Sequence, residues 1–187
     1  RDRLISVLSP LLLLGIWELS ARLGLIDTRF FPAPITILHT LIGLMDSGVL
    51  WINTWASLQR LFWGFLLGGI PALVLGVVMG LSRLMRAAID PLIAATYPIP
   101  KSAILPLILL IFGLGEASKI VMVAIGVFYP ICINAVAGVL EINKIYLDVG
   151  KNFQAGRWQT FRTIALPGAL PFIMSGIKLG VGMGLIL

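Results

Sequence analysis

The segment from Glu141 to Pro167, EINKIYLDVGKNFQAGRWQTFRTIALP, is the longest stretch that looks water-facing in an otherwise apolar sequence. Apolar residues nevertheless recur in it at helical spacing on both sides of a break at Ala155 and Gly156. They are Ile142, Ile145, Val149 and Phe153 before the break, and Trp158, Phe161 and Ile164 after it. We therefore predict two short amphipathic helices joined by a tight turn. Their apolar face and basic rim would form a docking surface for a soluble partner outside the bilayer.

The composition around this segment is that of a polytopic membrane protein. Of the 187 residues, 59% are hydrophobic, whereas soluble domains contain about 45–50%. The formal net charge is +6, but the basic residues are dispersed rather than gathered on one face. This pattern argues against nucleic acid as a partner and favours a role of the charges in membrane topology. The lipid bilayer is therefore the expected surrounding.

Five apolar regions could cross the roughly 30 Å hydrocarbon core as helices, since a span needs about 20 residues. They are 4–23, 56–81, 90–115, 119–139 and the region from 167 to the end of the sequence. Helices satisfy their own backbone hydrogen bonds in lipid, so the fold class we expect is all-α, with about five spans in this chain.

The third region is the least regular of the five because of its prolines. They are Pro91, Pro98, Pro100 and Pro106. These residues cannot all lie in one straight helix, and a broken backbone at membrane depth is tolerated only where protein or a water-filled cavity satisfies it. We therefore expect Pro100 and Lys101 to line a translocation path. The charge of Lys101 would suit an anionic solute; alternatively, this side chain reaches the lipid headgroups.

Two stripes of small residues predict close packing between helices. The first is Gly64 and Gly68 with Gly76 and Gly80, and the second is Gly176, Gly180 and Gly184. Two polar residues in the spans are further candidates for the path. Arg60 either anchors its helix at the interface or contacts the solute, and Asn134 should face other helices.

The distribution of charge predicts the orientation of the chain. With the N-terminus in the cytoplasm, eight cations fall inside and three outside, as the positive-inside rule requires. The inner set is Arg1, Arg3, Arg83, Arg86, Lys144, Lys151, Arg157 and Arg162, and the outer set is Arg22, Arg29 and Lys119. The segment 141–167 would then be cytoplasmic.

The sequence contains no motif for chemistry of its own. We find no phosphate-binding loop, no nucleophile elbow and no group of histidine, cysteine or acidic residues with metal-ligand spacing. We therefore expect no enzyme activity, no metal and no cofactor bound by this chain. A passive channel and an integral membrane enzyme are the alternatives, but the first leaves the segment 141–167 unexplained and the second lacks a polar catalytic cluster.

The segment 141–167 resembles the cytoplasmic signature loop of the permease subunits of bacterial ATP-binding-cassette importers. The pattern of that loop is E-A-A, three residues, G, nine residues and I-x-L-P, and its end is matched by Ile164, Leu166 and Pro167. The departures are Asp148 for the glutamate, Val149 and Gly150 for the two alanines, and Gln154 for the glycine. A glycine follows two residues later, at Gly156, so the geometry of the turn is open.

Other stretches resemble the permeases of the nitrate, sulfonate, taurine and bicarbonate group, in the same order along the chain. They are FFPAP at 30–34, SLQR at 57–60, IPKSAILPLILLIFGLGEASK at 99–119 and LPGALPFIMSGIKLG at 166–180. The resemblance covers nearly the whole chain. It implies one transmembrane permease domain over residues 1–187, of the type I importer fold, with at least one more span beyond Leu187.

The resemblance also implies the partners and the site. Two copies of the chain would form the pore in the bacterial inner membrane, a periplasmic solute-binding protein would deliver a small anion, and two ATPase subunits, which hold the ATP, would dock on the coupling loop 141–167. Asp148, Gln154, Ala155, Gly156 and Arg157 would contact the ATPase, together with the end of the pattern. In the alternative interpretation, Asp148 only favours a helix start and Gly156 only makes a turn.

Overall fold

The computed structural model describes the backbone of residues 2–187, and their side chains except those of residues 2–4, 144, 147, 151 and 157. Every regular element in this part is helical, which confirms the all-α prediction. The chain divides into two compact units, Arg1–Ala56 and Ser57–Leu187. The expectation of one domain over the whole chain stays a prediction.

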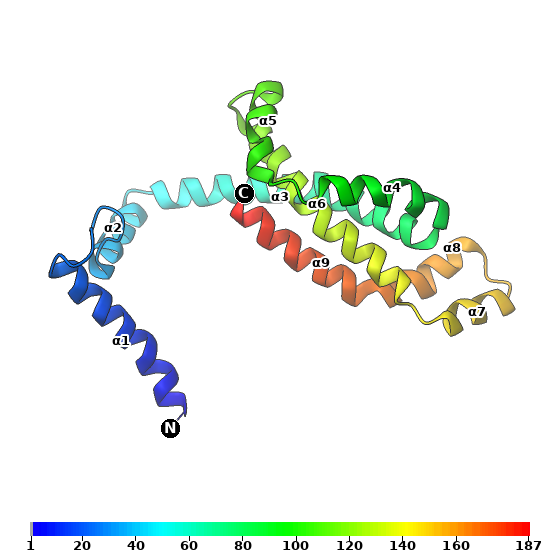
Figure 1. Ribbon diagram of the computed structural model, residues 1–187, viewed down its shortest axis with the longest axis horizontal. Helices are drawn as coiled ribbons and strands as arrows, with labels where there is room; N and C mark the ends of the chain where they lie inside the picture. The colour runs from blue at the N-terminus through cyan, green and yellow to red at the C-terminus, as the bar shows by residue number, and fades with distance from the viewer. Residues whose placement is uncertain (1) are drawn as a thin grey trace. The chain divides into compact units, whose positions relative to one another are not determined.

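The first unit contains α1 (Asp2–Arg22), α2 (Pro34–Asp46) and the first residues of α3 (Val49–Leu81) (Figure 1). The carboxylate of Glu18 joins α1 to α2. It accepts a hydrogen bond from Arg22 Nε at 2.6 Å, and another from the backbone N–H of Ile35 at 3.0 Å. A negative charge at this place is favourable because the first N–H groups of α2 have no partner within the helix.

In the second unit, α6 (Glu116–Leu140) packs against the glycine stripe of α3. A Cβ atom at Gly68 would lie 2.1 Å from the carbonyl oxygen of Ala124, and one at Gly76 would lie 2.6 Å from that of Cys132. Glycine is therefore required for the close approach of the two helices. The first predicted packing stripe is confirmed, and its partner is α6.

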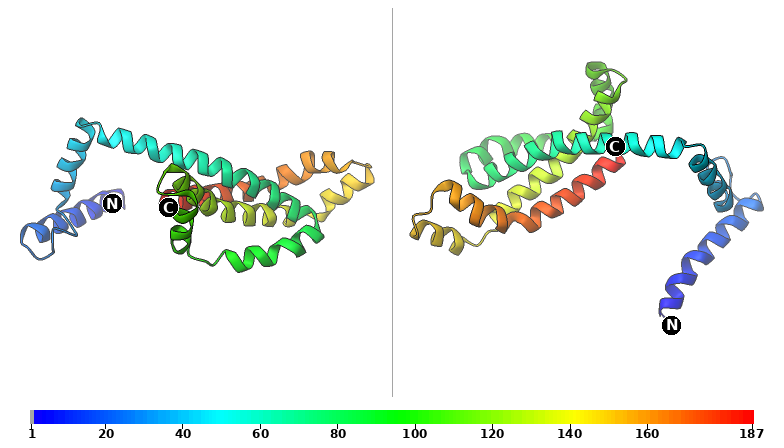
Figure 2. Two further views of the ribbon diagram at one scale, coloured as in Figure 1. Left: turned by 90° about the horizontal axis from the view of Figure 1, so that it is seen from above. Right: turned by 180° about the vertical axis from the view of Figure 1, so that it is seen from behind.

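The opposite neighbour of α6 is α9 (Leu166–Ile186), which runs beside it in the views of Figures 1 and 2. A Cβ atom at Gly176 would lie 2.8 Å from the Cβ of Asn134, and Gly180 faces Ile131. The second predicted stripe is thus also a packing face. Because α6 is lined by small residues from both neighbours, its middle is the most buried part of this unit; Val127, Ile131, Cys132 and Ala135 have no solvent exposure.

The third apolar region is broken, as the prolines predict. Helix α4 (Arg83–Thr96) is followed by a 3-10 turn, η1 (Lys101–Ile104), and by α5 (Leu105–Phe112). The two halves are bent by 87°, and Pro98 and Pro100 lie in the break between them.

Four continuous helices among the described residues are long and apolar enough to cross a membrane. They are Ile5–Arg22, Val49–Leu81, Glu116–Leu140 and Trp158–Ile186. The bent pair formed by α4 and α5 would be a fifth span if it crosses as one unit, in agreement with the expected number. The second span begins at Val49 rather than near residue 56.

The segment 141–167 contains two short helices joined by residues 153–156, as predicted: α7 (Lys144–Asn152) and α8 (Arg157–Thr160). The second is not separate from the last span, because α8 continues through a π-helical turn, η2 (Phe161–Ala165), into α9. In this wide turn the N–H of Leu166 bonds to the carbonyl of Phe161, five residues earlier. The widening lets the helix continue past Pro167, which would otherwise collide with the preceding turn.

Candidate functional site

Helix α7 begins at Lys144, and the residue before it, Asn143, caps the helix with its side chain. The Oδ1 atom of Asn143 accepts a hydrogen bond from the N–H of Ile145 at 3.0 Å, and its carbonyl accepts one from Tyr146 at 3.0 Å. Asp148 therefore lies inside α7, where it is exposed. Asn143, and not Asp148, marks the start of the helix.

The turn after α7 depends on the backbone of Gln154. Its φ of 53° lies in the left-handed region that favours glycine. The N–H of Ala155 donates to the carbonyl of Gly150 at 2.9 Å, the long-range bond of a Schellman motif. The turn thus has the conformation that the glycine of the signature pattern would favour. Gly156 has no positive φ, and its carbonyl accepts the N–H of Thr160 at 2.9 Å at the start of α8.

The two ends of the segment pack together through Gly150 and Ile164. A Cβ atom at Gly150 would lie 3.0 Å from Ile164 Cδ1, so the small residue allows α7 to approach η2. Ile164 and Leu166 also border a buried cluster that includes Ala169, whereas Pro167 is exposed in the first turn of α9. The end of the signature pattern therefore holds the segment against the helical core.

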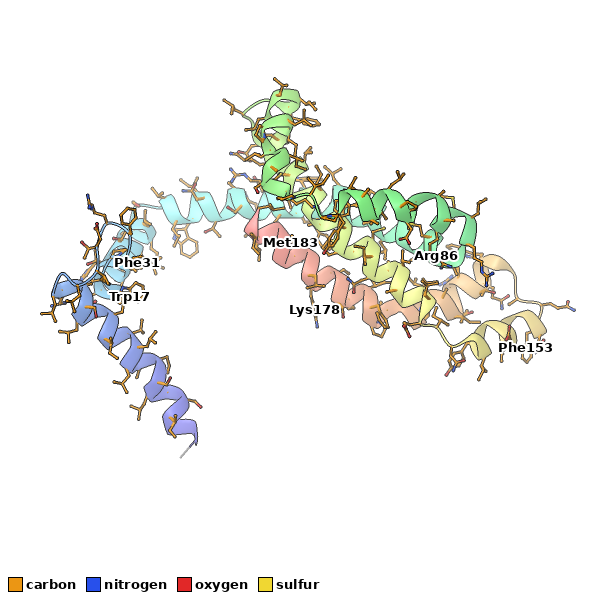
Figure 3. All side chains as sticks on the ribbon, in the orientation of Figure 1. Trp17, Phe31, Arg86, Phe153, Lys178 and Met183 are labelled. Atoms are coloured by element: carbon orange, nitrogen blue, oxygen red, sulfur yellow. The ribbon has the colours of Figure 1, made fainter. Side chains whose placement is uncertain are left out.

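The outer side of α7 and of the turn is apolar and exposed. Phe153, labelled at the end of α7 in Figure 3, is 82% exposed, and Trp158 is 71% exposed. Ile145, Tyr146 and Val149 are the other exposed apolar residues of α7. Only part of the predicted apolar face is free, because Ile142 is buried and Phe161 and Ile164 are half-buried. The side chain of Arg157 lies outside the described residues, and Ala155 is half-buried.

Arg60 belongs to an ion cluster at one end of α6. Its guanidinium donates two hydrogen bonds to the Glu116 carboxylate, at 2.5 and 2.9 Å, and Lys119 Nζ donates a third at 2.8 Å. We did not single out Glu116 from the sequence. The sequence indicates that a counter-charge is needed, because an arginine inside an apolar run requires one, but it does not indicate which acidic residue supplies it.

Lys101 is held at the break of the third region. Its Nζ atom donates to the carbonyl oxygens of Tyr97 at 2.8 Å and of Ile99 at 3.0 Å. It also lies 4.4 Å from the centre of the Tyr129 ring, within the range of a cation–π interaction. Lys101 thus satisfies carbonyls that the break at Pro100 leaves without helical partners. Neither of the two sequence interpretations included this role.

Asn134 faces a neighbouring helix, as expected. Its amide donates to the carbonyl of Pro130, in the same helix, at 2.8 Å, and its Cβ lies against Gly176 of α9. The candidate path residues Arg60, Lys101 and Asn134 have separate sets of partners in the described chain. The structure therefore does not join them into one site.

Comparison with known proteins gives the family. Residues 72–187 match the family described as binding-protein-dependent transport system inner membrane component. The chain belongs to this family. The predicted resemblance to importer permeases and the predicted importer transmembrane fold are thereby confirmed, and the chain is a multi-pass membrane component of a transport system.

Relatives of this inner membrane component carry several substrate names. It is 34% identical to the taurine transport system permease protein TauC of Escherichia coli, over 98% of this chain and 69% of the relative. It is 33% identical to the putative aliphatic sulfonates transport permease protein SsuC of Bacillus subtilis, over 95% and 64%. It is also 34% identical to the riboflavin transport system permease protein RibX of Chloroflexus aurantiacus, over 92% and 65%. The chain thus spans about two thirds of the length of each.

Proposed function

We propose that this chain is the membrane-spanning permease subunit of an ATP-driven importer for a small anionic solute, of the sulfonate or taurine type. Two copies form the translocation path, a periplasmic binding protein delivers the solute, and separate ATPase subunits bind ATP. The N-terminus and the coupling loop 141–167 are cytoplasmic. Family membership supports this assembly, and the names of TauC and SsuC support the solute class.

The observation that carries the proposal is the exposed apolar face of α7 beside a turn that is firmly held. Exposed aromatic residues such as Phe153 and Trp158 are the usual anchors of protein interfaces. The Schellman turn at Gln154 and the contact of Gly150 with Ile164 fix this face relative to the N-terminal end of α9. A push on the face by a partner would therefore reach α9 directly, which is what coupling to an ATPase requires.

Copurification tests the docking surface. The full-length permease is purified from membranes in detergent with its ATPase, and Phe153→Ser is compared with Phe30→Ser, a change at a residue 76% exposed outside the loop. We expect Phe153→Ser to weaken ATPase binding by roughly tenfold or more, since an aromatic anchor contributes about 2 kcal/mol. Phe30→Ser should leave it unchanged. If both variants bind the ATPase like the wild type, the loop is not the coupling site; if the wild type binds none, the importer proposal fails.

A further inference from the structure

Lys178 is a cation in the interior of the span Trp158–Ile186. It lies twelve residues after Leu166 and eight before Ile186, so about 12 Å or more of helix separates it from either end of α9. The continuous span to which α9 belongs, Trp158–Ile186, has 29 residues, more than the roughly 20 that cross the hydrocarbon core. Lys178 is exposed in the single chain. An ammonium at this depth cannot be left in lipid without a large loss of solvation.

Three cations of the other apolar helices have partners, whereas Lys178 has none among the described residues. Arg22 pairs with Glu18, Arg60 pairs with Glu116, and Lys101 is held by two carbonyls. No hydrogen bond or ion pair joins Lys178 to the part of the chain that the structure describes. No partner among the described residues therefore compensates its positive charge.

The geometry of α9 places Lys178 away from the helix core. Gly176 and Gly180 face α6, and a step of two residues turns the helix by about 200°, nearly to the opposite face. Figure 3 shows the Lys178 side chain projecting from α9 on the side away from α6. Ser175 and Gly182 lie within about one quarter-turn of it. Both are exposed, and a Cβ atom at Gly182 would meet nothing within 4 Å.

We propose that Lys178 lies on the water-filled translocation path and forms an ion pair with the anionic group of the solute. Charged residues inside spans are placed in protein or in aqueous cavities and are typical of solute pathways. A small anion would accept hydrogen bonds from the ammonium of Lys178. The neighbouring serine and glycine are small and leave space for the anion beside the helix. This inference rests on the proposed function and adds the residue that recognises the anion.

Accessibility to water is the first test. The complete transporter is first freed of its other reactive cysteines, which in this chain requires Cys132→Ala. Single cysteines are then introduced as Lys178→Cys, Gly182→Cys and Leu179→Cys. Leu179 is an exposed apolar residue, turned about 100° around the helix from Lys178, and serves as the lipid-facing control. We expect the impermeant anion 2-sulfonatoethyl methanethiosulfonate to modify positions 178 and 182 about tenfold faster than 179, since only a hydrated thiol ionises readily. Equal slow rates at 178 and 179 would overturn the placement of Lys178 on the path.

Uptake of radiolabelled taurine into proteoliposomes, with ATP and the partner subunits, is the second test. We expect Lys178→Gln to reduce uptake at limiting taurine by about tenfold, the usual effect of removing a charge-assisted hydrogen bond, while Lys178→Arg retains most of it. Leu179→Ala is the matched control, and gel filtration checks assembly. If Lys178→Gln transports like the wild type, the ion pair is disproved. If the wild type itself takes up no taurine, the assigned solute class fails, and the labelling rates still decide where Lys178 lies.

Discussion

At the scale of single residues, Gln154 sets the geometry of the loop turn, and we expect Gln154→Gly to stabilise it. A left-handed conformation costs a residue with a side chain about 1–2 kcal/mol, and glycine does not bear this cost. Glycine, however, loses roughly 0.5–1 kcal/mol more conformational entropy on folding, because it has greater freedom in the unfolded chain. The net gain should be about 0.5–1 kcal/mol. Hydrogen–deuterium exchange of the amides of α7 would show it as slower exchange, whereas Gln154→Val should accelerate exchange.

The neighbouring Gly156 provides the control for that measurement. Its φ is not positive, and an added Cβ atom would meet nothing within 4 Å. Gly156→Ala should therefore leave the exchange of α7 unchanged or slow it slightly. Faster exchange in Gly156→Ala than in Gln154→Val would show that the turn depends on residue 156 and would contradict the role given to Gln154.

The pair of Arg60 and Glu116 makes a second prediction at this scale. Arg60→Glu alone should lower the yield of monodisperse protein in detergent, because two carboxylates would then face each other at the end of α6. The double exchange of Arg60→Glu with Glu116→Arg should restore most of the yield, since it re-forms the pair in reverse. If the double exchange is no better than the single one, Arg60 has a role other than holding this pair.

The sequence predicted single residues well where a residue acts through its own backbone or its spacing, and poorly where it acts through a distant partner. The positions of the signature pattern fall on the turn and on the Gly150–Ile164 contact. Glu116 was missed because 56 residues separate it from Arg60, and no periodicity links two helices that meet only in the fold. Asn143 was missed because several polar residues could have started the helix.

At the scale of elements, the contact between α3 and α6 requires a hydrogen atom at position 68. In Gly68→Ala, the new methyl group would meet the backbone of Ala124, which cannot move aside as a side chain would. We expect overpacking to lower the free energy of unfolding by about 1–3 kcal/mol, and therefore to lower the thermal unfolding midpoint in detergent by roughly 5 °C. Gly43→Ala, with nothing within 4 Å in α2, is the control and should not lower the midpoint. Equal midpoints would mean that the two helices do not approach so closely.

The break between α4 and α5 makes a second prediction for elements. Spin labels at Leu92 and Leu110, both exposed on the two helices, report their separation by pulsed electron resonance. Because Lys101 holds two carbonyls at the break, we expect Lys101→Met to broaden the distance distribution, while taurine should leave the wild-type distribution unchanged. A narrow distribution in Lys101→Met would show that the prolines fix the break alone, and would reopen a role of Lys101 toward the solute.

Elements were more predictable than their contacts, for a physical reason. The prolines at 98 and 100 remove backbone donors, so they forecast the break wherever the segment lies in the fold. The glycine stripes forecast a packing face for the same local reason. Neither could show that α6 is the common neighbour of α3 and α9, because a stripe specifies a face but not the helix that covers it. The continuation of α8 into α9 depends on the π-helical turn, which no residue pattern predicted.

At the scale of the whole molecule, the bent pair of α4 and α5 decides the side of the membrane on which the loop lies. Four continuous spans with a re-entrant pair would place residues 141–157 on the side opposite to a cytoplasmic N-terminus, where no ATPase could reach them. If the pair crosses as a fifth span, the loop returns to the cytoplasm. The eight inner cations agree only with this second count.

Reporter proteins fused to this chain after chosen residues decide between four and five spans. With five spans, alkaline phosphatase should be active after Leu25 and after Leu114, and inactive after Ser82 and after Asn143; a fluorescent protein should give the reverse pattern. The fusions at Leu114 and Asn143 carry the test, since a re-entrant pair would invert both while leaving those at Leu25 and Ser82 unchanged. Such an inversion would remove the docking surface from the cytoplasm, and would therefore disprove the assignment of Phe153 and Trp158 to an ATPase contact. It would not affect the placement of Lys178 in a water-filled path, because the cysteine labelling tests that placement independently.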